Sequence, residues 1–360
     1  MEKLSVAGTG DRILFLRLMS GRTSLAPVRG AAPTCFERAM TVSGASSRRV
    51  EAIPSFGEEI RDVEGMIQKR VLTTFALLAC LALGGPAEAG EAGGRTGGFE
   101  AVFTERWPHS SLRHVLRRMQ QELPPGSAAG LDYRIDQEKY SVYVPSDYSG
   151  DAAYGLVVWV SSGEKGDMPE GWSALMDKHK LIWIGAHRSG NEHNLYGRRM
   201  PLALDAVFNM TKKYNIDPNR VYVCGDSGGG RVASILAMHY AEVFSGGVFI
   251  VGAEYWEPVP VTGRPGHMWK PMPKPQSRYL AIARSRGRYV LLTGDHDANR
   301  AQTWDFYEKG YKRKLRHVLY IQVPSMGHET PPAQWYEKAI VFLDTAATAK
   351  ENAAPQTEPD

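Results

Sequence analysis

Cysteine is scarce in this chain of 360 residues, which has only Cys35, Cys80 and Cys224. Of these, only Cys224 lies outside the first 89 residues, a region that we expect to be absent from the mature protein. A lone thiol cannot form an intramolecular disulfide, and no cluster of cysteine and histidine residues suggests a metal site. We therefore expect no disulfide framework, no metal and no organic cofactor.

The chain also lacks a strong excess of charge of either sign. Its 43 Lys and Arg residues stand against 39 Asp and Glu residues, which gives a formal net charge of +4 at pH 7. Half of that excess comes from residues 1–89, which hold 11 basic and 9 acidic residues. Because nucleic-acid-binding proteins usually carry a clustered excess of basic residues, we expect no nucleic-acid partner.

Long hydrophobic runs are missing as well. The apolar run from Val71 to Leu83 is shorter than the roughly 20 residues that a membrane-spanning helix needs. A Lys-Arg pair precedes this run and a Gly-Gly-Pro-Ala-Glu-Ala segment follows it, which completes the three parts of a secretory signal peptide. We therefore predict a signal peptide at residues 66–89, cleaved after Ala89, with export to the periplasm or the medium and no stable membrane span after cleavage.

Two features of the N-terminal region need their own interpretation. The segment Leu77–Cys80 loosely resembles a lipoprotein acylation site, but Leu78 is unusual there and further apolar residues follow Cys80, so we expect no lipid anchor. A signal peptide should begin a protein, yet 65 residues precede this one. We therefore expect translation to start at Met66, with residues 1–65 a non-native or disordered extension.

The remaining chain divides into an N-terminal segment, one domain and a tail. Residues 90–132 contain a Gly-rich linker and a short basic helix, and residues 347–360 have the composition of a disordered tail. Between them, residues 133–346 alternate apolar strands with stretches of helical periodicity, and several strands are apolar throughout. This pattern predicts an α/β fold with a mostly parallel, doubly wound sheet and helices on both faces. The expected strands begin near Tyr140, Gly155, Leu181, Val221, Gly247, Arg288 and His317.

The most informative stretch is Val221–Gly230, in which an apolar run ends in glycines around one serine. Residues Gly225–Gly229 fit Gly-x-Ser-x-Gly, the nucleophile elbow, in which a strand turns sharply into a helix and exposes the serine oxygen. The same sequence, Gly-Asp-Ser-Gly-Gly, also occurs around the catalytic serine of trypsin-like proteases. Those proteases are antiparallel barrels whose histidine precedes the serine, and no histidine before Ser227 has a catalytic context here, His187 being the nearest approach.

Partners for Ser227 follow it in the sequence. A serine hydroxyl needs an imidazole to take its proton and a carboxylate to orient that imidazole. Asp295 and Asp297 follow one expected strand and His328 follows the next, which gives the order Ser, Asp, His of α/β-hydrolases. Either aspartate could turn toward His328, or Asp295 could brace the loop, and His296 is more simply a loop residue.

These motifs resemble those of the α/β-hydrolase superfamily, and especially its exported esterases of the polyhydroxybutyrate-depolymerase and feruloyl-esterase kind. The resemblance covers roughly residues 139–345. It implies an α/β-hydrolase fold and an ester hydrolase that acts through an acyl-enzyme on a small-molecule or polymeric ester. In that family the acid lies a few residues after the glycine that ends its strand, which favours Asp297 over Asp295. The segments that carry the resemblance are Asn215–Val223, Gly225–Gly229, Thr293–Asp297 and Met326–His328.

Such enzymes need an oxyanion hole, in which two backbone N–H groups face the developing negative charge. The first is that of Gly228, the residue after the serine. The second should come from the loop after Val160, where the family usually has His-Gly and this chain has Ser-Ser-Gly. That departure leaves the donor open between Ser162 and Gly163, of which we choose Ser162.

Two further segments concern the substrate side of the site. Arg188 and Asn191 belong to the carboxyl end of the sheet, where ligands bind in such folds, although a solvated loop is the simpler interpretation. The irregular segment Glu254–Gln276 is either a cover for the active site or an ordinary surface excursion, and its aromatic residues could line a sugar or phenolic site or simply pack. A prolyl-oligopeptidase-like peptidase and a non-catalytic binding protein remain alternatives to an esterase.

Overall fold

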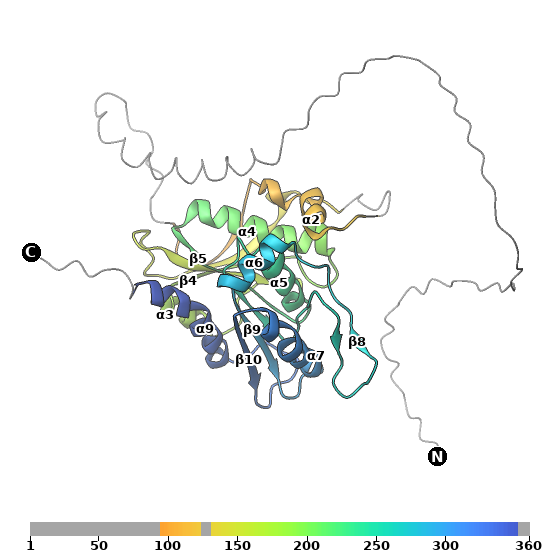
Figure 1. The fold of residues 1–360 in the computed structure, drawn as a ribbon. Coiled ribbons are helices and arrows are strands. Elements are labelled where there is room, and N and C mark those ends of the chain that lie inside the picture. Colours follow the sequence, from red (N-terminus) through yellow and green to blue (C-terminus); the bar gives the residue numbers. More distant parts are fainter. Residues whose placement is uncertain (1–93, 124–130, 352–360) are drawn as a thin grey trace, which may run out of the picture. The chain divides into compact units, whose positions relative to one another are not determined.

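The computed structural model describes residues 94–123 and 131–351, and within them eight strands form one sheet in the order β1-β2-β4-β3-β5-β6-β9-β10 (Figure 1). Strand β2 pairs antiparallel with β1 and β4, and the pairs from β4 to β10 are all parallel. The predicted, mostly parallel sheet is therefore confirmed. The strands are β1 Gly97–Val102, β2 Lys139–Val144, β3 Tyr154–Val160, β4 Leu181–Ala186, β5 Ile216–Asp226, β6 Gly246–Ile250, β9 Arg288–Gly294 and β10 His317–Val323.

Helices follow most of the parallel strands, and β7 with β8 forms a separate small hairpin. Helix α9 continues past the domain end predicted at residue 346. The predicted signal peptide and residues 1–65 lie outside the described residues. The α-helices are α2 Leu112–Met119, α3 Ser173–Lys178, α4 Met200–Lys213, α5 Gly228–His239, α6 Ser277–Arg286, α7 Arg300–Asp305, α8 Lys312–Lys314 and α9 Ala333–Glu351. The other elements are β7 Val259–Pro260, β8 Met268–Trp269, the 3₁₀ turns η1 Pro108–Ser110 and η2 Ile135–Gln137, and the π-helical turns η3 Leu195–Arg199 and η4 Phe306–Tyr311.

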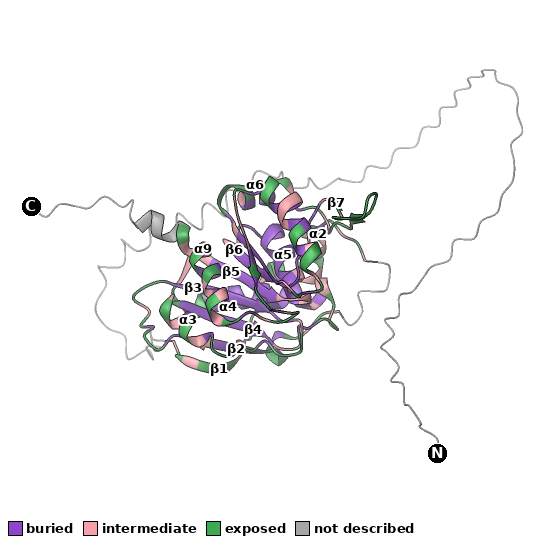
Figure 2. Cartoon of the chain, turned by 90° about the horizontal axis from the view of Figure 1, so that it is seen from below, coloured by how far each residue is buried: buried purple, intermediate pink, exposed green. Residues whose placement is uncertain are grey.

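The strands in the middle of the sheet contribute to two hydrophobic cores, one on each face (Figure 2). In β3, Leu156 and Val158 belong to one core, whereas Val157 and Trp159 belong to the other. Successive side chains of a strand point to opposite faces, so a strand that is apolar throughout has to be covered on both sides. Helices α2, α4, α5 and α6 contribute to the first core and α3 and α9 to the second, which confirms the predicted helices on both faces.

Strand β1 lies in the segment that the sequence indicated as a linker. It pairs with β2 from Gly97 opposite Val144 to Val102 opposite Lys139, and its residues alternate between half-buried and exposed. The strand begins with two glycines and has one side that faces solvent, so its alternation of apolar and polar residues is short and weak. It is therefore hard to recognise from the sequence. The sheet therefore begins well before Tyr133, the predicted start of the domain.

The N-terminal segment is also attached to the domain through α2 and the residues before it. Val115 and Met119 of α2 are fully buried in the first core. The buried carboxylate of Asp205 in α4 accepts hydrogen bonds from the Trp107 N–H at 2.8 Å and the Tyr133 hydroxyl at 2.5 Å. Burial raises the pKa of Asp205, and these hydrogen bonds oppose that rise.

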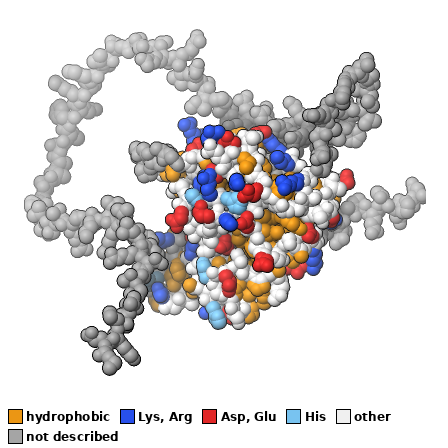
Figure 3. All heavy atoms as spheres, turned by 180° about the vertical axis from the view of Figure 1, so that it is seen from behind, with side chains coloured by type: hydrophobic (Ala, Val, Ile, Leu, Met, Phe, Trp, Pro, Cys, Tyr) orange, Lys and Arg blue, Asp and Glu red, His pale blue; other side chains and the backbone are white. Residues whose placement is uncertain are grey.

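The surface carries charges of both signs. On the face drawn in Figure 3, basic and acidic side chains are interspersed with hydrophobic ones. Across residues 94–123 and 131–351, no helix combines the length and the apolar character that crossing a bilayer would require.

Candidate active site

Ser227 lies at the sharp turn between β5, which ends at Asp226, and α5, which begins at Gly228. Its φ of 49° and ψ of −118° lie outside the conformations that residues with a Cβ favour. Hydrogen bonds hold this conformation, since the Ser227 N–H donates to Ile250 O at 2.8 Å and the Arg231 N–H donates to Ser227 O at 3.1 Å. The strained turn therefore belongs to the residue that the motif marks as the nucleophile.

The glycines on either side of Ser227 allow backbone to pack against backbone. A Cβ on Gly225 would lie 2.5 Å from the carbonyl oxygen of Val160, and one on Gly229 would overlap the same oxygen. Val160 is the last residue of β3. The close packing therefore brings the loop after β3 next to the Ser227 turn.

The structure brings Ser227, His328 and Asp297 into one hydrogen-bonded series. His328 Nε2 lies 2.8 Å from Ser227 Oγ, and His328 Nδ1 lies 2.7 Å from Asp297 Oδ1. The His328 side chain is 41% exposed, whereas that of Asp297 is fully buried. With Nδ1–H donated to the carboxylate, Nε2 is the nitrogen that can accept the serine proton.

Several hydrogen bonds fix the buried carboxylate of Asp297. Its Oδ2 accepts from the Thr293 hydroxyl at 2.5 Å, and its Oδ1 accepts from the Asn299 N–H at 3.0 Å. The side chain of Asn299 donates in turn to Val251 O at 2.8 Å, and Val251 has a φ of 45°, which is unusual for a β-branched residue. These bonds offset the cost of burying the carboxylate and hold it in the orientation that faces His328.

Asp295 and His296 stand outside this series of hydrogen bonds. The Asp295 N–H donates to Val323 O and the His296 N–H donates to Met326 O, both at 3.1 Å. The His296 ring is 72% exposed, and its nearest carboxylate is that of Asp295 at 3.9 Å. Both backbones therefore link the loop after β9 to the segment that leads to His328. This arrangement agrees with a bracing role for Asp295 and with His296 as a loop residue.

The loop after β3 corrects the prediction for the second oxyanion donor. The Ser162 N–H donates to Asp226 Oδ1 at 3.1 Å, and the Ser162 hydroxyl donates to Oδ2 at 2.5 Å. The N–H of Ser162 is therefore not free to meet a substrate oxygen. The alternative, the Gly163 N–H, donates to the Ser161 hydroxyl at 3.0 Å. Gly228 is the first residue of α5, so its N–H has no acceptor within the helix.

Arg199, which belongs to no sequence motif, is a buried residue whose hydrogen bonds hold the loop after β3 in place. It is 7% exposed, and it donates to Ser161 O at 3.0 Å and to Ser189 O at 2.7 Å. Burial lowers the pKa of its guanidinium, and the Asp226 carboxylate opposes this shift. Arg199 therefore ties the loop after β3 to the loop after β4. A buried arginine before a helix has no sequence signal of its own, so the role of Arg199 cannot be predicted from the sequence.

Arg188 and Asn191, both on the loop after β4, have different surroundings in the structure. Arg188 donates to both oxygens of the buried Glu138 carboxylate, at 3.0 Å and 3.1 Å, and Glu138 also pairs with Arg198. Asn191 is exposed, and a Cβ on Gly228 would overlap its Oδ1. Of the two, Asn191 therefore lies against the Ser227 turn, while Arg188 is held in an ion pair.

The segment Glu254–Gln276 contains the hairpin of β7 and β8. Its residues Tyr255 and Trp256 are 1% and 3% exposed and belong to the first core, so packing accounts for them. Trp269 donates from its indole N–H to Asp305 Oδ2 at 2.9 Å, and the Thr262 N–H donates to the same oxygen at 2.9 Å. The hairpin is thereby attached to α7.

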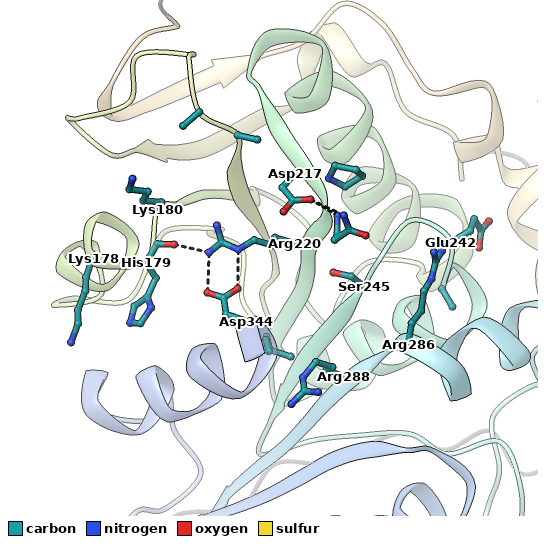
Figure 4. A pocket seen from close by; sticks show the side chains of 16 residues that line it. Lys178, His179, Lys180, Asp217, Arg220, Glu242, Ser245, Arg286, Arg288 and Asp344 are labelled. Atoms are coloured by element: carbon teal, nitrogen blue, oxygen red, sulfur yellow. Dashed lines mark hydrogen bonds and ion pairs between the residues drawn. The ribbon is translucent and has the colours of Figure 1, made fainter. Parts of the chain in front are cut away.

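A cavity of about 630 Å³ lies at the other end of the sheet. Figure 4 shows Arg220 and Asp344 paired in its lining, where they are joined by two hydrogen bonds of 2.9 Å. Its lining includes Arg288 and Ser245, at or next to the amino ends of β9 and β6. Because ligands of open α/β sheets bind at the carboxyl ends of the strands, the candidate site is the one around Ser227.

Cys224 is a fully buried free thiol in β5. Burial raises its pKa to about 11, so the thiol is protonated at neutral pH and lacks the thiolate form in which a cysteine is reactive. Within residues 94–123 and 131–351, no group of three His, Cys, Asp or Glu side chains is arranged to hold a metal ion.

Comparisons with known proteins find a sequence similarity over part of the chain and structural similarities at low sequence identity. No protein-family model matches the chain. Poly(3-hydroxyalkanoate) depolymerase C of Paucimonas lemoignei is 35% identical over 98 residues, which are 24% of this chain and 24% of the depolymerase. The chain thus matches less than two thirds of that relative's length.

Solved structures of a hydrolase and of an esterase resemble a larger part of the chain at low identity. S-formylglutathione hydrolase of Staphylococcus aureus has a TM-score of 0.44 at 12% identity, over 57% of this chain and 92% of that one. Esterase 2 of Thermogutta terrifontis, in its butyrate-bound structure, has a TM-score of 0.41 at 15% identity, over 61% of this chain and 92% of that one. With its mostly parallel sheet, its helices on both faces and its serine at a strand-to-helix turn, this chain has the α/β-hydrolase fold.

Proposed function

We propose that this protein is a serine hydrolase that cleaves carboxylic esters through an acyl-enzyme. The observation that carries the proposal is the series from Ser227 Oγ through His328 to Asp297, with distances of 2.8 Å and 2.7 Å. A nucleophile, a base and an orienting carboxylate within hydrogen-bond reach of each other are the parts that acyl transfer requires. In this proposal the turn at Ser227 is a nucleophile elbow.

The proposed reaction has two halves. In the first, Ser227 Oγ attacks the ester carbonyl carbon while His328 Nε2 takes the hydroxyl proton, and the carbonyl oxygen becomes an oxyanion beside the Gly228 N–H. The bond to the alcohol breaks as His328 returns the proton to the leaving oxygen, and the acyl group stays on Ser227. In the second, His328 takes a proton from water, the resulting hydroxide attacks the acyl carbon, and the acid leaves as Ser227 regains its proton. Asp297 stabilises the imidazolium that forms in each half.

An ester is favoured as substrate by the sequence likeness to a poly(3-hydroxyalkanoate) depolymerase. The substrate in this proposal is a small-molecule or polymeric ester, and poly(3-hydroxyalkanoate) is a polymeric one. The partial exposure of His328 agrees with such a substrate, because a polymer chain has to reach the nucleophile without first being enclosed.

A panel of p-nitrophenyl esters and aminoacyl anilides tests this proposal. We expect ester hydrolysis at rates at least about 100-fold above those for the anilides, together with labelling of Ser227 by a fluorophosphonate probe. Faster cleavage of the anilides would favour a peptidase of the prolyl-oligopeptidase type. Absence of both turnover and labelling would favour a non-catalytic binding protein and would reject the proposal.

We also propose that the protein is exported through the signal peptide at residues 66–89. Sequencing the N-terminus of the natural mature protein is expected to give Gly90 as the first residue, because a small-residue cleavage site ends at Ala89. A mature chain that begins before Met66 would overturn both the cleavage site and the start at Met66.

A further inference from the structure

The oxyanion hole of the proposed hydrolase lacks a free second backbone donor in the loop where one is expected. The Ser162 N–H donates to the Asp226 carboxylate, a charged acceptor that water or a substrate carbonyl does not readily displace. The Gly163 N–H donates to the Ser161 hydroxyl, within the same loop. Two N–H groups are needed near the developing charge. Of these three N–H groups, that of Gly228, the first residue of α5, has no acceptor within the helix, whereas the other two already donate to side chains of the protein.

Asn191 offers a different kind of donor at this place. An ideal Cβ on Gly228 would overlap Asn191 Oδ1 and would lie 2.7 Å from its Cγ and 3.0 Å from its Nδ2. The carboxamide therefore lies directly beside the residue whose N–H faces the oxyanion. It is exposed, and it makes no hydrogen bond with the described side chains and backbone, so its polar atoms are available to a substrate.

Hydrogen bonds and close packing fix the backbone around Asn191, and this defines the position from which its side chain extends. The Asn191 N–H donates to Ser162 O at 3.0 Å. A Cβ on Gly190 would lie 2.6 Å from Gly163 O, which shows how closely the two loops pack. The buried Arg199 donates hydrogen bonds to the loop after β3 and to the loop after β4. A donor on such a support costs little reorganisation when charge develops beside it.

We infer that the Asn191 carboxamide supplies the second donor of the oxyanion hole, beside the Gly228 N–H. The inference rests on the proposed function. A half-turn about the terminal torsion of asparagine exchanges Oδ1 and Nδ2, and that torsion has two broad minima. An oxyanion beside Gly228 favours the orientation that directs Nδ2–H toward it. Asn191 thereby contacts the reacting atoms and binds the tetrahedral intermediate more strongly than the substrate.

The test compares Asn191→Ala and Asn191→Asp with wild type in p-nitrophenyl ester hydrolysis. Removing one oxyanion donor lowers kcat by about 100-fold, with KM changed by no more than about twofold. Asn191→Asp keeps the shape of the side chain but replaces the donor by a negative charge, so its loss is at least as large. Glu192→Ala, an exposed neighbour on the same loop, serves as the matched control and is expected to keep the wild-type kcat.

An inhibitor gives a second measurement that a merely structural role would not change. A phenylboronic acid bonds through boron to Ser227 Oγ, and a boron-bound oxygen of the anionic adduct occupies the oxyanion hole. Its affinity is expected to fall by the same factor as kcat in Asn191→Ala, while the rate of fluorophosphonate labelling in Glu192→Ala matches wild type. A raised KM with unchanged kcat would indicate a role in binding substrate alone and would overturn the inference.

The rival donor is the Gly163 N–H, which becomes available if the Ser161 hydroxyl turns away. Under that alternative, Asn191→Ala keeps kcat within about threefold of wild type, and Ser161→Ala accelerates turnover because the N–H is free from the start. Either of these results would overturn the assignment of Asn191 while leaving the esterase proposal intact. The esterase proposal itself fails if the wild type neither hydrolyses esters nor labels at Ser227, or if it cleaves the anilides faster than the esters.

Discussion

Ser227→Ala is expected to lower kcat for p-nitrophenyl esters by about 10⁶-fold, the scale seen when the nucleophile of a serine hydrolase is removed. Alanine leaves no oxygen to attack the carbonyl, and His328 then has no proton to take from position 227. The substitution removes one oxygen from a half-buried side chain, so we expect the fold to persist. Initial rates with purified protein, together with fluorophosphonate labelling, measure the effect.

Ser285→Ala is the matched control for this prediction. Ser285 is an exposed serine in α6 whose hydroxyl donates to Ile282 O at 3.1 Å, within its own helix. This variant is expected to keep both the turnover and the labelling of wild type. If Ser227→Ala retained either one, the nucleophile would have to be another residue.

Asp297→Asn is expected to lower kcat by about 10⁴-fold. An amide at position 297 can donate to His328 Nδ1, which would place the imidazole proton on Nε2 and remove the base that Ser227 needs. The loss should appear in kcat, because the substrate does not contact the buried carboxylate. A pH profile of kcat recorded for both proteins would show whether the variant recovers activity where hydroxide replaces the base.

Asp295→Asn tests which of the two aspartates orients His328, a choice that the sequence left open. Its backbone N–H bonds to Val323 O, and its carboxylate stays outside the series through His328, so we expect kcat within about threefold of wild type. A larger loss in Asp295→Asn than in Asp297→Asn would reverse the assignment of the acid.

The sequence predicted the parts of this protein that depend on short-range pattern. Apolar runs such as Leu156–Val160 predicted central strands, because strands buried on both faces have to be apolar throughout. The glycines around Ser227 predicted a sharp turn, and two later expected strands placed Asp297 and then His328 after it in the order of a triad. The structure brings these three side chains within hydrogen-bond reach.

The residues that the sequence did not reveal act through tertiary contacts. Asp226 occupies a variable position of the motif, yet its carboxylate accepts a hydrogen bond from the Ser162 N–H, the donor predicted for the oxyanion hole. Arg199 links two loops that are far apart in the chain, and only the folded backbone shows that Ser161 O and Ser189 O come within its reach. No periodicity or spacing predicts such contacts, because they depend on how loops pack at one end of the sheet.

Strand β1 affects how this protein has to be handled. It covers the outer side of β2, whose backbone N–H and carbonyl groups would otherwise face solvent unpaired on that side. An exposed strand edge is a template on which other chains can add as further strands, which leads to aggregation. A recombinant chain cut at Tyr133, as the sequence alone would suggest, would end its sheet in β2, in which every second residue is buried. A chain that begins at Gly90 ends the sheet in β1 instead, a short strand in which every second residue is exposed.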